Sequence, residues 1–244
     1  MRILTILQAR MSSSRLPGKV LKPILGEPMM ARQIARLRRA RHLGDLVVAT
    51  SVGPEDDVVA ACAQTLGCLV FRGPLNDVLA RYAGALEAHG PADHVVRVTA
   101  DCPLTDWRVI DQVIERHLQS GADYTSNTVE RTYPKGLDVE IVRAPLLLEA
   151  AREAQDPYER EHVTPFFYFR PDRFRIVQVT QGLDQNLLRW TVDTPADFTF
   201  ADAVYRTLFP ARPDFLSEDI LALPGAGRTD PDDPGTTDPT EESR

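Results

Sequence analysis

Short apolar runs alternate along the chain with longer segments whose apolar residues recur at helical spacing. In the first half, runs typical of strands occupy residues 3–7, 46–50, 68–71, 93–99 and 122–125. The segments between them have the periodicity of helices and occupy residues 28–41, 55–66, 76–89 and 107–119. Strands that alternate with helices in this way favour a mainly parallel sheet with helices on both faces. We therefore predict an α/β fold of the Rossmann-like kind.

After residue 123 the pattern is less regular. Strands are expected at 135–142, 174–179 and 188–192, and helices at 145–154, 158–168 and 196–208. Asp106 and Thr194 each precede a predicted helix and are typical N-caps, and Asp197 falls in the first turn of the last helix. We expect this half to complete a single domain over residues 1–222 and to supply the acceptor side of a cleft.

The end of the chain differs in composition from the rest. Residues 223–244 are rich in Pro, Gly, Thr and Asp and have few apolar side chains, so we expect an acidic, disordered tail. This tail carries six acidic residues and two arginines, which account for −4 of the net charge of −7. An acidic chain of this kind does not suit a protein that coats nucleic acid.

The remaining composition excludes several classes of protein. The apolar runs are far shorter than a helix that spans a bilayer, and Met1-Arg2 leads directly into a strand. We therefore expect a cytoplasmic protein that binds no membrane. Cys62, Cys68 and Cys102 form no CxxC pair and have no histidine at metal spacing, which favours reduced thiols over disulfides or structural zinc.

A basic loop follows the first predicted strand. Residues 8–19, QARMSSSRLPGK, hold Arg10, Arg15 and Lys19 among three serines and a Pro-Gly turn. The carboxyl end of a parallel strand is a usual place for a phosphate-bearing ligand, and three cations exceed what one phosphate group needs. The loop therefore suggests a triphosphate site, although it lacks the glycines of a Walker A motif. The alternative is a solvated basic turn.

Two aspartates occupy comparable positions at other strand ends. Asp101 follows the run 93–99, and Asp193 follows the run 188–192. Magnesium is usually held by one or two carboxylates together with phosphates and water, so these two side chains could share one Mg²⁺ ion. For Asp101 the alternative is a carboxylate that only completes a turn.

Several motifs together resemble one family of enzymes. The segments are 9–19 (ARMSSSRLPGK), 71–73 (FRG), 77–82 (DVLARY), 101–104 (DCPL), 136–140 (GLDVE), 160–164 (REHVT) and 192–198 (VDTPADF). They are similar to the cytidylyltransferases that activate acylneuraminate and 3-deoxy-manno-octulosonate, and most similar to the group of spore-coat polysaccharide biosynthesis protein F. The resemblance covers roughly residues 1–210.

The resemblance implies a nucleotide-diphospho-sugar transferase (GT-A-like) fold, CTP as the donor, and Mg²⁺ on Asp101 and Asp193. It implies transfer of CMP to an acidic sugar or related acceptor with release of pyrophosphate, for surface polysaccharide synthesis, by an enzyme that is expected to be a homodimer. Arg10 and Lys19 would be catalytic with the two aspartates. The nucleotide would also contact Ala9, Ser12, Arg15, Thr50, Arg72, Asn76, Asp77 and Ala100.

The acceptor side rests on fewer signals. Arginine matches carboxylates and phosphates, and carboxylates accept from hydroxyl groups. The candidates for binding the acceptor are Lys135, Asp138, Glu140, Arg160 and His162. For each cation the alternative is a surface charge or a helix cap. The general base stays open between Asp193 and a metal-bound water.

Two other functions compete with this interpretation. A glycosyltransferase on a similar fold would use a nucleotide-sugar donor, but it would want a DxD metal motif where this chain has Asp101-Cys-Pro. A nucleotide-binding module without turnover is the second alternative, and the presence of Lys19, Asp101 and Asp193 together disfavours it.

Overall fold

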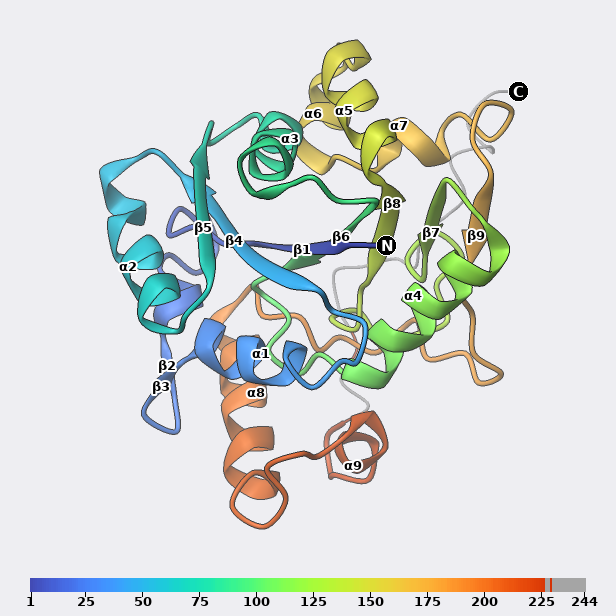
Figure 1. The fold of residues 1–244 in the computed structure, drawn as a ribbon. Coiled ribbons are helices and arrows are strands. Elements are labelled where there is room, and N and C mark those ends of the chain that lie inside the picture. The colour runs from blue at the N-terminus through green and yellow to red at the C-terminus, as the bar shows by residue number, and fades with distance from the viewer. Residues whose placement is uncertain (227–228, 230–244) are drawn as a thin grey trace, which may run out of the picture.

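A seven-stranded sheet forms the centre of the computed structural model, which describes residues 1–226 and 229 (Figure 1). The strand order is β5-β4-β1-β6-β8-β7-β9. The strands are β1 (Ile3–Gln8), β4 (Asp45–Ser51), β5 (Leu69–Gly73), β6 (His94–Thr99), β7 (Tyr124–Ser126), β8 (Glu140–Arg143) and β9 (Ile176–Gln178). Only β8 runs antiparallel to its neighbours, so the prediction of a mainly parallel sheet is confirmed.

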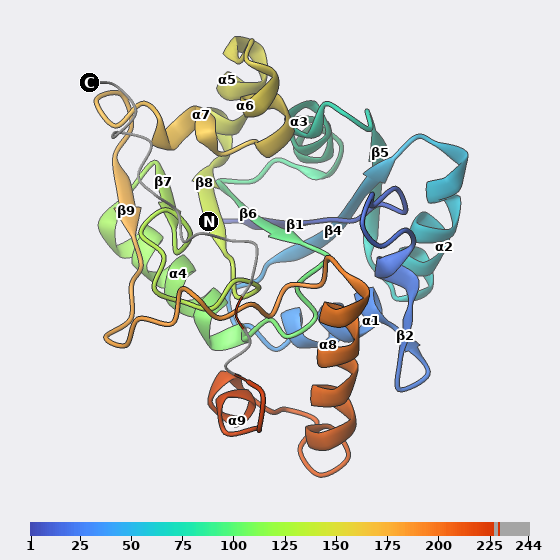
Figure 2. The same cartoon turned by 180° about the vertical axis from the view of Figure 1, so that it is seen from behind.

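Helices cover both faces of this sheet (Figures 1 and 2). One face carries α3 (Val78–His89), α5 (Ala144–Glu153), α6 (Pro157–His162) and α7 (Pro165–Tyr168). The other carries α1 (Met29–Leu37), α2 (Asp57–Thr65), α4 (Trp107–Ser120), α8 (Pro195–Leu208) and α9 (Ser217–Leu221). Two 3₁₀ turns, η1 (Lys19–Leu21) and η2 (Pro54–Asp56), and a small hairpin of β2 (Pro23–Ile24) and β3 (Glu27–Pro28) complete the described elements.

The central strand β1 shows why the sheet is buried on both sides. Because side chains alternate along a strand, Leu4 and Ile6 pack with the helices of one face, whereas Ile3 and Leu7 pack with those of the other. All four side chains are buried. A strand that is covered on both faces has a continuous apolar sequence, which is the pattern seen at its position in the chain.

Three expected elements are shorter or differently shaped than their sequence pattern suggested. The run 135–142 forms a strand only from Glu140, because Gly136 adopts φ +109 and a Cβ there would lie 2.7 Å from the Thr191 nitrogen. The run 188–192 makes isolated bridges instead of a strand. The expected helix over 158–168 is divided at Val163, whose φ is +71.

Of the predicted tail of residues 223–244, the structure describes 223–226 and 229, and the rest lies outside the described residues. The tail was predicted to begin too early, because Ala226 is buried and its carbonyl oxygen accepts from the Trp190 indole at 3.2 Å. In the part that the structure describes, no helix combines the length and the apolar character that crossing a bilayer requires.

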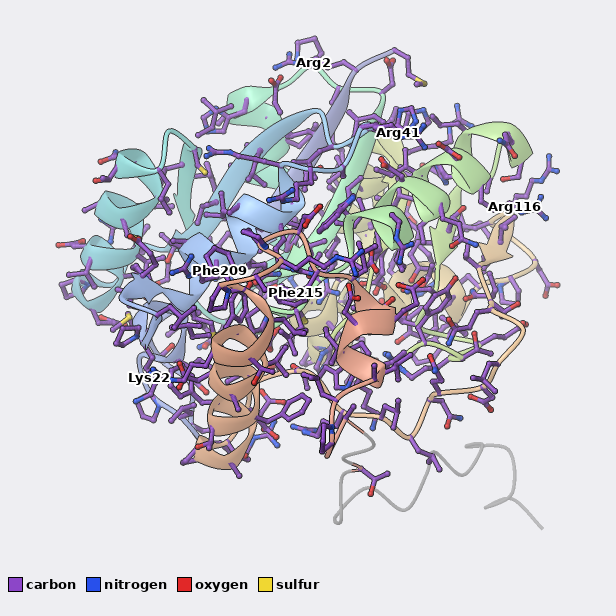
Figure 3. All side chains as sticks on the ribbon, turned by 90° about the horizontal axis from the view of Figure 1, so that it is seen from below. Arg2, Lys22, Arg41, Arg116, Phe209 and Phe215 are labelled. Carbon is purple, nitrogen blue, oxygen red and sulfur yellow. The ribbon has the colours of Figure 1, made fainter. Side chains whose placement is uncertain are left out.

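Two polar side chains bind the chain near residue 215 to the rest of the fold. They are Arg36 of α1 and Asp106, the N-cap of α4. Arg36 is buried and donates to the carbonyl oxygens of Thr105 (2.6 Å) and Phe215 (3.0 Å), with its guanidinium 4.2 Å from the Phe215 ring centroid. Figure 3 views this face, with Phe209 and Phe215 near α8 and α9. Asp106 caps α4 at the Arg108 amide and accepts two hydrogen bonds from Ser217. The predicted cap at Asp106 is thus confirmed.

We predict that Asp106→Asn lowers the free energy of unfolding by about 1–3 kcal/mol at pH 7, as expected for lost hydrogen bonds to a charged group. Burial alone would raise the pKa of Asp106, but hydrogen bonds from Arg108 and Ser217 outweigh it and hold the pKa below its usual value. The carboxylate therefore stabilises the fold above its unfolded pKa, and this contribution disappears as the pH falls through the folded pKa.

Urea denaturation of both proteins at pH 7 and at about pH 3 checks this. The difference between them should be large at pH 7 and shrink in acid. Asp214→Asn, at an exposed position, serves as the control. A difference that is the same at both pH values would contradict the assignment.

Candidate active site

A cavity of about 240 Å³ opens where the carboxyl ends of β1 and β6 meet. Parallel neighbours place these ends at one edge of the sheet, which is where α/β proteins bind ligands. Its lining comes mainly from the end of β1 with the loop that follows and from the end of β6 with the residues that follow. Val78, Glu161, His162 and Asp193 are contributed by other parts of the chain. The lining residues are Gln8, Ala9, Arg10, Ser13, Ser14, Arg15, Lys19, Val20, Val78, Arg97, Thr99, Ala100, Asp101, Glu161, His162 and Asp193. We call this space the first cavity.

Lys19 lies at the centre of the polar contacts in the first cavity. Its Nζ is 2.8 Å from Asp193 Oδ1, 3.3 Å from Asp101 Oδ2 and 2.8 Å from the Val192 carbonyl oxygen. The side chain is only 10% exposed. Burial alone would lower the pKa of Lys19, but the charges and hydrogen bonds of the two aspartates outweigh it and raise the pKa. Lys19 is therefore a charged ammonium group.

Asp193 is held by more than Lys19. Its second oxygen, Oδ2, accepts from Arg189 at 2.7 Å and pairs with Arg15 at 3.1 Å. Its backbone N–H donates to Asp197, which forms a capping box with Thr194 at the start of α8. The predicted cap at Thr194 is thus confirmed, and it fixes Asp193 immediately before a helix N-terminus.

Asp101 occupies the facing position beyond the end of β6. Burial alone would raise its pKa, but the Lys19 charge and hydrogen bonds from Thr99 and Cys102 hold the pKa below its usual value. The Cys102 thiol lies 3.5 Å from Asp101 Oδ1, and burial raises the pKa of this thiol well above its usual value. Asp101 is thus an anion beside a neutral thiol, and all three cysteines are free.

The donor atoms around Lys19 are those that magnesium prefers. Two carboxylates and a carbonyl oxygen surround the ammonium group, so one cation already lies between the two aspartates. The described residues contain no cluster of three or more His, Cys, Asp or Glu side chains that could hold a metal. A magnesium ion on Asp101 and Asp193 would therefore need further oxygens from phosphates and water. The residues present fit such an ion.

A second cavity, of about 250 Å³, adjoins the first. Arg97, Thr99 and His162 line both. The other residues of the second cavity are Val98, Thr128, Asp138, Glu140, Tyr158, Thr164 and Tyr168. Two ligands that occupied the two cavities would meet at the shared residues. The arrangement therefore suits a reaction between two bound molecules.

The candidate acceptor residues fall into two groups. Asp138, Glu140 and His162 line the second cavity. Lys135 and Arg160 line neither of the two cavities. The backbone of Lys135 pairs with the segment at 188–190. Arg160 makes two hydrogen bonds to Asp77 Oδ2, at 2.8 and 2.6 Å, and so connects α6 to the start of α3.

The candidate nucleotide residues are similarly divided. Ala9, Arg10, Arg15, Lys19 and Ala100 line the first cavity, whereas Ser12, Thr50, Arg72, Asn76 and Asp77 do not. Arg72 donates to the carbonyl oxygens of Ser51 and Gly53 and pairs with Asp57, so it fastens the loop after β4. Asp77 caps α3 by accepting from the Ala80 amide. The Thr50 hydroxyl is buried and has no partner among the described residues.

Sequence reasoning missed two arginines of the site. Arg189 contacts Asp193 four residues further along the chain. Arg97 lies in β6 and forms an ion pair with Glu140 of β8. A signal for Arg97 was present, because it is a charged residue inside the apolar run 95–98 of a central strand. Arg189 likewise interrupts the apolar run 187–190.

The chain is similar to known proteins in both sequence and fold. The cytidylyltransferase family model matches residues 4–206. The spore coat polysaccharide biosynthesis protein SpsF of Bacillus subtilis is 33% identical over 228 residues, 91% of this chain and 93% of that protein. The 3-deoxy-manno-octulosonate cytidylyltransferase of Syntrophobacter fumaroxidans is 41% identical over 120 residues, 47% of this chain and 46% of that protein. The structure of a cytidylyltransferase from Leptospira borgpetersenii superposes with a TM-score of 0.85 at 30% identity, covering 91% of this chain and 92% of that one.

We predict that Arg160→Met lowers the free energy of unfolding by ~1–2 kcal/mol, because Asp77 is left half-buried without its cation. Methionine keeps the aliphatic packing, so the loss reports the ion pair together with the hydrogen bonds to the carbonyl oxygens of Ala151 and Ala154. Thermal or urea unfolding measures it, with the exposed Arg152→Met as the matched control. Equal stability of Arg160→Met and the control would show that Arg160 is not needed for the fold.

Proposed function

The chain belongs to the cytidylyltransferase family and is a nucleotidyltransferase, and from this we propose that it transfers CMP from CTP to an acidic sugar or related acceptor. Pyrophosphate is the second product, Mg²⁺ is the cofactor, and the product serves surface polysaccharide synthesis. The observation that carries the proposal is the convergence of Lys19, Asp101 and Asp193 in a cavity that opens onto a second one. The names of the relatives support the donor and the class of acceptor.

The proposed reaction requires positioning and charge compensation more than covalent catalysis. The acceptor hydroxyl attacks the α-phosphorus of CTP and gives its proton to a base, either Asp193 or water. The bond between the α-phosphorus and the oxygen that bridges to the β-phosphorus breaks, and pyrophosphate leaves with that oxygen. Arg10, Arg15 and Lys19 lie in the first cavity and would offset the negative charge of the triphosphate. Asp101 and Asp193 would hold magnesium, which when bound supplies further positive charge to the triphosphate and the leaving pyrophosphate.

The acceptor would lie in the second cavity, with its reacting hydroxyl near the shared residues Arg97, Thr99 and His162. Tyr158 and Tyr168 give this cavity aromatic walls that suit the C–H faces of a sugar. A homodimer in the cytoplasm belongs to the same proposal, and sedimentation of the purified protein would test the assembly.

We predict that Asp101→Asn lowers the rate of pyrophosphate release from CTP by roughly 100-fold or more, as expected when a group that stabilises transition-state charge is removed. The assay combines CTP, Mg²⁺ and a panel of acidic sugars. Lys19 keeps its contacts with Asp193 and the Val192 carbonyl oxygen in this variant, so circular dichroism should show an intact fold.

The matched control is Asp172→Asn, which changes an exposed aspartate and should keep full activity. Normal activity of Asp101→Asn would contradict the metal assignment. Release of a nucleoside diphosphate from a sugar-nucleotide donor, with none of pyrophosphate from CTP, would identify a glycosyltransferase instead.

A second prediction concerns metal binding without nucleotide. The Lys19 ammonium lies against both aspartates and offsets part of their charge, so the free protein should bind Mn²⁺ weakly. Lys19→Met leaves two adjacent carboxylates without this cation and should bind Mn²⁺ at least tenfold more tightly, an order-of-magnitude expectation for removing one adjacent charge. Electron paramagnetic resonance of free Mn²⁺ measures the affinity in the absence of CTP.

The double variant Lys19→Met/Asp101→Asn should return the Mn²⁺ affinity to about that of the wild type, since one carboxylate is lost together with the cation. Equal affinities in the wild type and Lys19→Met would refute the view that Lys19 stands in the place of a metal.

A further inference from the structure

Arg97 is a charged side chain in the middle of the sheet. It lies in β6, between β1 and β8, and is 20% exposed. Burial alone would lower its pKa, but the charge of Glu140 outweighs it and raises the pKa, so the guanidinium keeps its charge. Burying a charge is unfavourable unless it is paired and hydrogen-bonded. Glu140 explains how the charge is tolerated, but not why a charged side chain lies at this place in the sheet.

Only one end of the guanidinium is held by the protein. Its Nη1 donates to Glu140 Oε2, and the other oxygen of Glu140 accepts from the Tyr124 hydroxyl at 2.6 Å. Glu140 is 5% exposed, so both of its oxygens are fixed by these contacts. Nε of Arg97 is buried without a hydrogen-bond partner, and no described residue accepts from Nη2. The guanidinium is thus anchored at Nη1, and among its other nitrogens Nη2 is the unpartnered one that is not buried.

The position of Arg97 indicates what the unpartnered end of its guanidinium could bind. Arg97 lines both cavities, so it lies where an acceptor in the second cavity would meet a nucleotide in the first. The planar fork of an arginine matches a carboxylate better than it matches any other common sugar substituent except phosphate. Among the described residues that line the second cavity, no other is a lysine or an arginine. Asp138 is paired with Arg131 at 2.6 and 3.0 Å.

We propose that Arg97, held by Glu140 and Tyr124, binds the carboxylate of the acceptor and determines its specificity for acids. This rests on the proposed function, since it presumes an acceptor in the second cavity. The carboxylate is then close to the hydroxyl that attacks CTP, and the hydroxyl-bearing remainder of the acceptor lies toward Asp138. An acid whose carboxylate is remote from the reacting hydroxyl, such as a uronic acid, fits less well.

The test compares acids with their uncharged counterparts. The probes are 3-deoxy-manno-octulosonate, other 2-oxo sugar acids and glucuronate, each with its carboxamide, in the pyrophosphate assay with CTP. The main variant is Arg97→Gln/Glu140→Gln, which removes both members of the ion pair and leaves no unpaired buried charge. Arg97→Lys keeps the positive charge but lacks the planar guanidinium that binds a carboxylate through two N–H groups. It provides a second test if the double variant does not fold.

We expect the wild type to prefer 2-oxo acids over their carboxamides by about 10–100-fold in kcat/KM, the range of a charge-assisted hydrogen bond. The preference should disappear in the double variant and weaken in Arg97→Lys. The CTP dissociation constant, measured by calorimetry, should stay within about twofold, because Arg97 acts on the acceptor. Tyr124→Phe should raise KM for the acid without changing kcat, since it acts only through Glu140.

Three outcomes would overturn the inference and one would overturn the proposed function. The inference fails if the double variant keeps the preference for acids, if the wild type uses only uncharged acceptors, or if glucuronate is the best acid. The proposed function fails instead if the wild type binds CTP but releases pyrophosphate with none of the probes.

Discussion

The contact of Lys19 with Asp101 and Asp193 is the interaction around which the site is arranged. It joins residues that lie 82 and 174 positions apart in the sequence. Charges this poorly exposed are tolerated only when they are paired, because removal from water costs several kcal/mol per ion. The loop after β1, the turn after β6 and the start of α8 must therefore converge within hydrogen-bond distance. The sheet and the helices must bring these three segments to the same edge of the fold.

The apolar core provides the frame that makes it possible. Because β1 and β6 are adjacent and parallel, the basic loop and Asp101 leave the sheet at the same edge. The capping box at Thr194 fixes the first turn of α8, and the Val192 amide donates to the Asp101 carbonyl oxygen at 2.8 Å. The two carboxylates are thus positioned by a strand end and a helix start, which are more rigid than loops alone.

The sequence predicted those parts that follow from local pattern. The central strands were found to within one or two residues because both of their faces are buried, and the caps at Asp106 and Thr194 have a local chemical cause. The run 135–142 was overextended because Gly136 lies against the backbone of Trp190, a tertiary contact that no periodicity records. The pairing of Arg160 with Asp77 joins positions 83 apart and is equally invisible in the sequence.

The charges of the first cavity bear on how the substrate would enter. Apart from Arg97, which pairs with Glu140, this cavity has three cationic side chains and three carboxylates. Lys19 is already shared between two of those carboxylates. A triphosphate would bring several negative charges into this space. The side chains of the first cavity alone would not balance the charge of the triphosphate. The described residues also offer too few ligands to hold a divalent ion firmly by themselves. Under the proposed function, charge balance therefore favours binding of the metal and the nucleotide together.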